Sequence, residues 1–171
     1  CFSLEKYCDD EFKSESTVEE DCFFEFRDNI ITEIQENNST ILDFCNNVFP
    51  DKTNEEWADI FLSLERLDDY WTIVLNDLKS IDIDEILIPE NFRNCFKNLQ
   101  IYLIYRHLNE FSSEKELMFI HLSCEIITNL CKIHLKKYGS LNFEDVIEYS
   151  RMYSSEIEYS DENIEKLLEM L

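Results

Sequence analysis

Residues 113–137, with the sequence SEKELMFIHLSCEIITNLCKIHLKK, form the most apolar stretch of the chain. Its apolar positions lie too close together to fit on one stripe: Leu117, Phe119, Ile120, Leu122, Cys124, Ile126, Ile127, Leu130, Cys131, Ile133 and Leu135. A helix that is apolar on most of its faces is surrounded by other helices. The stretch therefore predicts an all-α fold, a compact bundle of about seven helices around a central helix at about 113–137.

The sequence marks both the start and the end of this central helix. Residues 113–116 (SEKE) have the spacing of a capping box, in which a serine and a glutamate satisfy each other's free backbone amides. Lys136 and Lys137 fall in the last turn, where positive charge is favoured by the helix dipole. Gly139 follows and is expected to end the helix in a left-handed conformation.

Glycine is nearly absent from the chain, since Gly139 is the single one among 171 residues. Loops that hold phosphates or dinucleotides need several glycines, because only glycine lets the backbone approach a ligand so closely. Tight hairpins lose their usual Asn-Gly and Asp-Gly turns for the same reason. We therefore expect neither an enzyme nor a bound cofactor, and we expect a chain of helices joined by short polar links.

Further helices are expected on both sides of the central one, because apolar residues recur there at helical spacing. Residues 1–16 are acidic and irregular and are predicted to be an N-terminal arm, and 17–171 to be a single helical domain. The expected helices cover 17–34, 41–48, 53–79, 89–110, 142–153 and 160–171. The helix over 53–79 opens with a capping box, Thr53 to Glu56, and either runs through or bends near Asp68 and Asp69. Residues 80–88 are expected to be a linker or a short helix.

The formal charge of −23 restricts the partners that the protein can have. Such a surface repels phosphate backbones and anionic lipid, so we expect no nucleic acid and no membrane surface as a partner. No run of about 18 apolar residues is present, so no direct membrane span is expected in this chain. A basic or cationic amphipathic partner would be attracted. The alternative interpretation is that the charge only keeps an aromatic-rich protein soluble.

Seven cysteines leave two interpretations open. Cys124 and Cys131 fall in the apolar stretch and look like small core residues, as expected for a reduced, cytoplasmic chain. The other interpretation is a secreted chain, in which Cys1, Cys8 and Cys22 pair among themselves or with Cys45. Overlapping glycosylation sequons over 37–40 are compatible with secretion. A chain that begins at Cys1 is also compatible with a removed signal peptide or C-terminal anchor.

The best candidate metal ligands are His121-x-x-Cys124 and Cys131-x-x-His134. Members of each pair neighbour one another on a helix face. The two pairs begin ten residues apart, which is about 15 Å along a helix, too far for one zinc ion. We therefore expect core thiols and half-exposed histidines, with no metal site.

Residues 115–127 (KELMFIHLSCEII) resemble the buried central helix of the Bcl family of apoptosis regulators, in particular its short and divergent poxvirus members. Residues 141–149 (LNFEDVIEY) resemble the helix that packs next in that family, and the resemblance covers roughly 90–150. The Asn-Trp-Gly-Arg signature of the cellular members is absent, so the arginine that clamps a death-motif aspartate has no equivalent here.

The resemblance implies two modes of binding. In one, a groove between the helices at 53–79 and 90–110 captures an amphipathic host helix, with Leu67, Trp71, Phe96 and Tyr102 as its walls. In the other, the groove is closed, and an outer helical face binds a signalling adaptor or forms a homodimer. Under the first mode, Trp71→Ala is expected to weaken binding and to leave helicity intact, whereas a loss of helicity would identify Trp71 as core.

The sequence therefore predicts a non-enzymatic protein–protein interaction module, of the kind that viruses use against host apoptosis or innate immune signalling. Its place would be the cytoplasm, of the host cell if the protein is viral. The alternative is a secreted, disulfide-stapled helical protein that binds a host receptor or ligand, as a cytokine does. A third class, an intracellular scaffold subunit, would need a constitutive partner for stability.

Overall fold

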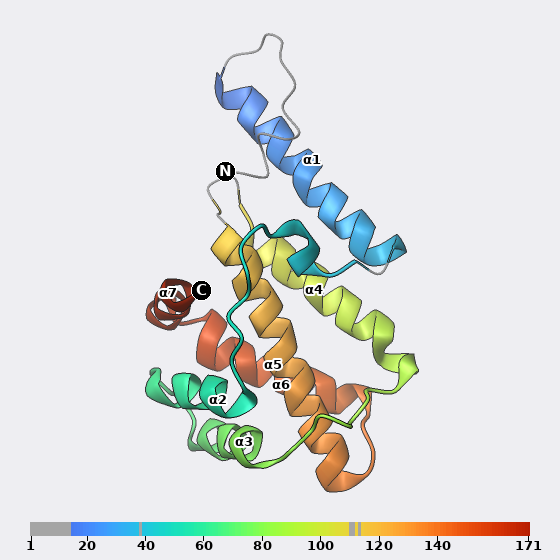
Figure 1. Cartoon of the computed structure of the whole chain (residues 1–171), viewed down its shortest axis with the longest axis vertical. Helices are drawn as coiled ribbons and strands as arrows, with labels where there is room; N and C mark the ends of the chain where they lie inside the picture. Colours follow the sequence, from blue (N-terminus) through green and yellow to red (C-terminus); the bar gives the residue numbers. More distant parts are fainter. Residues whose placement is uncertain (1–14, 38, 110–111, 113) are drawn as a thin grey trace. The chain divides into compact units, whose positions relative to one another are not determined.

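The computed structural model describes residues 15–37, 39–109, 112 and 114–171, with the side chains of 15–22 excepted. The described residues form α-helices and no strand, so the all-α prediction is confirmed (Figure 1). In chain order the helices are α1 (Glu15–Glu36), α2 (Asn54–Ser63), α3 (Asp69–Ser80), α4 (Arg93–His107), α5 (Glu114–Tyr138), α6 (Phe143–Tyr153) and α7 (Asp161–Met170). Three short helical segments lie between them: η2 (Ile41–Phe44), η3 (Glu90–Phe92) and η4 (Ser154–Glu158). Residues 1–14 of the predicted acidic arm and Ser113 of the predicted capping box lie outside the described residues.

The helix predicted at 113–137 is α5, and it is the longest of the described helices. Most of its apolar side chains are buried: Leu117, Met118, Phe119, Ile120, Leu122, Cys124, Ile126, Ile127, Leu130, Cys131 and Ile133. The helix ends as predicted at Gly139, which has a φ of 76° and donates its N–H to the carbonyl of Leu135 at 2.8 Å. No described helix is long and apolar enough to span a membrane.

The chain divides into two compact units. Unit 1 comprises 1–49 and 97–121, and unit 2 comprises 50–96 and 122–171, so that α4 and α5 contribute to both. The expectation of a single helical domain over 17–171 stays a prediction.

Unit 1 buries one face of α1, on which Phe26, Ile30 and Ile34 recur at helical spacing. The helix predicted over 41–48 is wrong in length, because η2 stops at Phe44. The backbone is extended at Cys45, and the N–H of Asn47 donates to the Glu114 carboxylate at 3.1 Å instead of continuing a helix.

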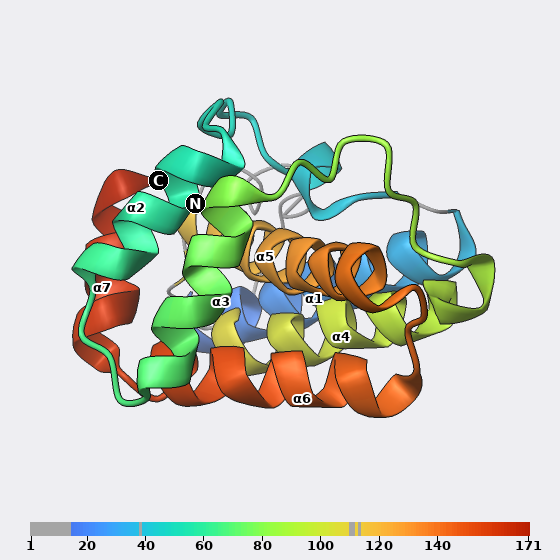
Figure 2. The same cartoon turned by 90° about the horizontal axis from the view of Figure 1, so that it is seen from below.

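In unit 2 the stretch predicted as one or two helices over 53–79 forms two, α2 and α3, which lie side by side in Figure 2. The predicted capping box starts α2: the N–H of Glu56 donates to the Thr53 hydroxyl at 3.2 Å, and the N–H of Thr53 donates to the Glu56 carboxylate at 2.8 Å. The backbone turns extended at Leu64, and Asp68 caps α3 by accepting the N–H of Tyr70 at 2.7 Å. The chain therefore breaks at 64–68, near the bend that the two aspartates predicted.

The core of unit 2 is built on large rings contributed by three helices. Trp71 of α3 meets Phe61 of α2 and Tyr153 of α6 edge-on, with ring centroids 6.4 Å apart in each case. The Tyr153 hydroxyl lies 2.8 Å from the Ser123 hydroxyl of α5, so this buried polar atom has a partner. Residues 81–88 contain no helix, as expected for a linker.

The C-terminal part of unit 2 runs through α6, η4 and α7. Asn142 starts α6 with a capping box to Asp145. η4 is a π-helical segment, in which the wider turn changes which side chains face inward, and both of its glutamates, Glu156 and Glu158, are buried. The Ser154 hydroxyl bonds the Glu158 carboxylate. The Ser160 hydroxyl then accepts the N–H of Asn163 at 3.3 Å and starts α7.

Candidate functional site

A buried carboxylate holds the loop between α2 and α3. Glu156 of η4 is 2% exposed, and its two oxygens accept the backbone N–H groups of Leu67 at 2.8 Å and Asp68 at 2.9 Å. Removing an ionised carboxylate from water costs several kcal/mol unless charge-assisted hydrogen bonds replace the lost hydration. Both oxygens of Glu156 have such a donor, so the buried charge is matched to this one loop conformation.

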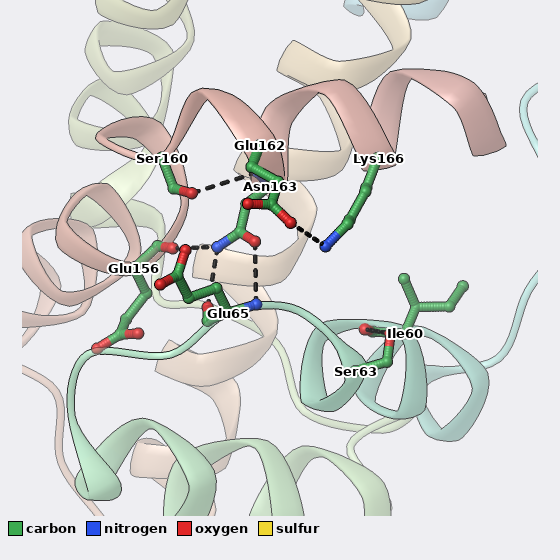
Figure 3. A network of polar contacts seen from close by, with 8 residues as sticks. All are labelled: Ile60, Ser63, Glu65, Glu156, Ser160, Glu162, Asn163 and Lys166. Atoms are coloured by element: carbon green, nitrogen blue, oxygen red, sulfur yellow. Dashed lines mark hydrogen bonds and ion pairs between the residues drawn. The ribbon is translucent and has the colours of Figure 1, made fainter.

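A buried side-chain amide holds the same loop nearer to its N-terminal end, at Glu65. The Asn163 carbonyl oxygen accepts the N–H of Glu65 at 3.1 Å, and its amide nitrogen donates to the Glu65 carbonyl at 2.9 Å (Figure 3). The same nitrogen donates to the backbone carbonyl of Glu156 at 2.8 Å, so the two tethering residues are themselves joined. We call 64–68 the tethered loop, because two buried polar side chains from the C-terminal segment fix its backbone.

The tethered loop holds an apolar side chain in solvent. Leu67 is 74% exposed, although it precedes the N-cap of α3, where an apolar residue often packs on the fourth residue of the helix. That fourth residue is Thr72, whose hydroxyl accepts a hydrogen bond from Arg66 at 3.3 Å. Leu67 therefore has no apolar partner at the position where such a leucine usually finds one.

Two further apolar side chains are exposed on α3. Tyr70 is 49% exposed and Ile73 is 55% exposed, and a spacing of three residues places them on the same side of the helix. The opposite side of α3 is buried through Trp71, Val74, Leu75 and Leu78. We call Leu67, Tyr70 and Ile73 the apolar ridge. Single exposed apolar residues are ordinary, but a row beside a fixed loop is typical of an interaction surface.

The structure places the predicted wall residues in different environments. Leu67 lies on the apolar ridge, whereas Trp71 is fully buried against Phe61 and Tyr153 and does not reach the surface in this conformation. Phe96 is half-buried in unit 2, and Tyr102 is about half exposed in unit 1. Of the four predicted wall residues of the groove, Leu67 and Trp71 are four positions apart at the start of α3. Leu67 is exposed at this position, whereas Trp71 is buried.

His134 joins α5 to the start of α6. Its Nε2 lies 3.3 Å from the Asp145 carboxylate, and its Nδ1 lies 3.2 Å from the Tyr149 hydroxyl. Burial, and to a smaller extent nearby groups led by Tyr70, raise the pKa of Tyr149 well above its usual range, so the hydroxyl stays protonated at neutral pH. Asp145 also belongs to the capping box of α6. The arrangement joins α5 to α6, because one imidazole of α5 contacts two side chains of α6.

The regular His and Cys pairs do not combine into a metal site. Among the described residues, no group of three His, Cys, Asp or Glu side chains is arranged to hold an ion. His121 meets the ring of Phe49 edge-on, with centroids 4.8 Å apart. Burial raises the pKa of Cys131 to about 12, helped by Cys95 and Asp145, so its thiol is protonated and unreactive at neutral pH.

The described cysteines carry free thiols. They are Cys45, Cys95, Cys124 and Cys131. Burial, and then the charge of Glu114, raise the pKa of Cys45 to about 11. The side chains of Cys1, Cys8 and Cys22 lie outside the described residues, so the alternative pairing among the N-terminal cysteines or with Cys45 stays a prediction.

The tethered loop depends on residues that the sequence analysis did not single out, namely Glu156 and Asn163. The chain matches no protein-family model, no curated protein and no solved structure.

Proposed function

We propose that this chain is a non-enzymatic protein–protein interaction module whose binding surface comprises the tethered loop and the apolar ridge. One observation carries the proposal: a buried carboxylate fixes the backbone on which an exposed leucine stands. Binding costs free energy when a loop must be ordered, and a loop that is already fixed avoids that cost. A connection between α2 and α3 would need no such tether merely to close the chain.

The proposed cellular role is inhibition of host apoptosis or innate immune signalling. Two features support it: the resemblance of 115–127 to the buried helix of the Bcl family, and the extensive burial of α5. In this role the ridge would bind a host helix or a signalling adaptor through apolar side chains spaced along one helix face.

Peptide binding tests the proposal. A set of fluorescently labelled amphipathic helices, which includes death-motif helices of host proteins, is titrated with the protein, and the anisotropy is followed. We expect at least one peptide to bind and Leu67→Asp to weaken it at least tenfold, since a charge in an apolar contact costs more than about 1.4 kcal/mol.

The chain offers a matched control for this variant. Leu87 lies in the same unit, in the linker before η3, and is 82% exposed. Leu87→Asp makes the same substitution at an exposed leucine outside the ridge, so its affinity should equal that of the unaltered protein. Equal weakening by both variants, or no binding by any peptide, would contradict the proposed surface.

The secreted alternative is distinguished by a count of thiols. The protein is alkylated in denaturant without reductant, and the intact mass is measured. Seven alkylated cysteines support the cytoplasmic module, because every cysteine is then reduced. Cysteines protected in pairs would instead move the search to an extracellular receptor or ligand.

A further inference from the structure

The side chains of the apolar ridge and the charges around it indicate which class of partner binds there. This inference rests on the proposed function. Leu67, Tyr70 and Ile73 follow one another at intervals of three residues along a loop and a helix. Tyr70 and Ile73 share one side of α3, and Leu67 is exposed on the loop that leads into this helix, which suits a partner helix that packs alongside α3.

Charge is distributed unevenly along α3. At its N-terminal end, Asp68 and Asp69 are exposed between Leu67 and Tyr70. At its C-terminal end, Asp77 is paired with Lys137 at 2.6 Å, and Lys79 is paired with Asp59 at 2.7 Å. Arg66 of the tethered loop donates to the Thr72 hydroxyl at 3.3 Å at the N-terminal end, which therefore carries two aspartates against one arginine and is net acidic.

The two aspartates at this end differ in what they already contact. The Asp68 carboxylate caps α3 through the N–H of Tyr70, and it lies near Arg151, whose pKa is raised mainly by its pair with Glu148 and to a smaller extent by Asp68. Asp69 lies in the first turn of α3 and is exposed. Its carboxylate is therefore the charge at the ridge that is most available to a cation from a partner.

A second copy of this chain is a poor occupant of the ridge. Each copy carries a formal charge of −23, and two such copies repel each other over about 10 Å at ordinary ionic strength. A self-association through α3 would also bring Asp69 and its counterpart toward the same interface. The charge is complementary to a cation, not to another copy.

We propose that the ridge binds an amphipathic helix of another protein, with Lys or Arg beside its apolar stripe and a cation placed over Asp69. The apolar stripe packs along Leu67, Tyr70 and Ile73. The charge of the whole chain steers the basic helix toward the surface, and Asp69 sets the direction in which it lies.

Two designed helical peptides with the same leucine stripe test this partner class. One carries Lys beside the stripe, and the other carries Glu at the same positions. We expect the Lys peptide to bind at least tenfold more tightly at about 50 mM salt and to lose most of this advantage at about 500 mM salt. Leu67→Asp should weaken the Lys peptide, whereas Leu87→Asp should not.

The role of Asp69 is tested with a pair of variants that change the charge equally. Asp69→Lys should weaken the Lys peptide about tenfold at low salt, and Asp84→Lys, in the exposed linker, by less than about twofold. Circular dichroism verifies that both variants are folded. Equal effects of the two substitutions would show that only the overall charge matters, and would overturn the placement of the cation.

The outcomes separate this inference from the proposed function. If the Glu peptide binds as tightly as the Lys peptide and binding still depends on Leu67, the basic partner is wrong and the interaction surface stands. If neither peptide binds, or Leu67→Asp has no effect, both fail. Sedimentation of the protein alone tests the other occupant, since a dimer dispersed by Leu67→Asp would assign the ridge to a second copy.

Discussion

The carboxylate of Glu156 and the backbone N–H of Leu67 are joined by a hydrogen bond of 2.8 Å between residues 89 positions apart in the chain. The other oxygen of the same carboxylate accepts the N–H of Asp68 at 2.9 Å. The position of an exposed leucine is thus set by a buried charge in the C-terminal segment. A substitution at Glu156 should therefore both lower the free energy of unfolding and alter the exposed surface at Leu67.

Glu156→Gln should lower the free energy of unfolding by about 2–3 kcal/mol, because one of the two N–H groups then faces an amide nitrogen and loses its acceptor. Urea denaturation measures the loss, and hydrogen exchange at the amides of Leu67 and Asp68 locates it. Glu165→Gln, at an exposed position of α7, is the matched control and should stay within about 0.5 kcal/mol. Unchanged exchange at both amides would contradict the tether.

Asn163→Ala should destabilise the protein by about 2–4 kcal/mol, because it removes both bonds to Glu65 and the bond to the Glu156 carbonyl. Combined with Glu156→Gln in a double-mutant cycle, the two losses should not add, since both residues hold one loop. We expect a coupling of about 0.5–2 kcal/mol. Strict additivity would mean that the loop is held at two independent places.

Trp71→Ala should lower the free energy of unfolding by about 3–5 kcal/mol, because Trp71 is fully buried among Phe61 and Tyr153. From the sequence, Trp71→Ala is expected to weaken partner binding and to leave helicity intact. The burial of Trp71 predicts instead that the substitution reduces the folded structure. Leu67→Ala, at an exposed site, should stay within about 0.5 kcal/mol. Thermal melts followed by circular dichroism distinguish the two expectations.

Gly139→Ala should cost about 1 kcal/mol through the backbone alone. The φ of Gly139 is 76°, and an added Cβ would meet no atom within 4 Å, so strain in the left-handed conformation is the only penalty. Gly139→Asn should cost less, because asparagine tolerates this region better than alanine. Equal costs for the two substitutions would point to a cause other than the conformation.

Local signals made much of the fold predictable. The apolar stretch at 113–137, the capping box at 53–56 and the cap at Gly139 each depend on neighbours within a few residues, and the structure has α5, the start of α2 and the end of α5 where they predict. The helix over 41–48 was predicted too long, because its shortening depends on a bond from Asn47 to the distant Glu114.

The tether could not be predicted, because its bonds join segments about ninety residues apart. One faint signal was present: Asn163 lies four positions before Leu167, so a polar side chain stands on the apolar face of α7. A polar residue at such a position needs a partner, but periodicity does not say which one. By the same periodicity, Trp71 belongs to the core face of α3 with Val74, Leu75 and Leu78. The prediction that Trp71 lines a groove relied instead on the general preference of tryptophan for partly exposed positions.

His121 should make the stability fall as the pH is lowered. Burial depresses the pKa of His121 below its ordinary value of 6.5, because the imidazolium is poorly hydrated in the fold. Above pH 6.5 the ring is neutral in both states and carries no penalty. As the pH falls through 6.5 the unfolded chain takes up a proton that the folded chain resists, so the free energy of unfolding decreases until the folded pKa is passed.

The size of this effect is about 1.4 kcal/mol for each unit by which the pKa is depressed. Urea denaturation of the unaltered protein and of His121→Gln at about pH 7.5 and about pH 5.5 isolates it, since all other titrating groups are common to both chains. We expect the unaltered protein to lose more stability between the two pH values than the variant does. An equal loss would mean that carboxylates alone govern the stability in this pH range. Glu125 has the opposite effect on the free energy of unfolding, because burial raises its pKa and its stabilising contribution is lost as the pH rises.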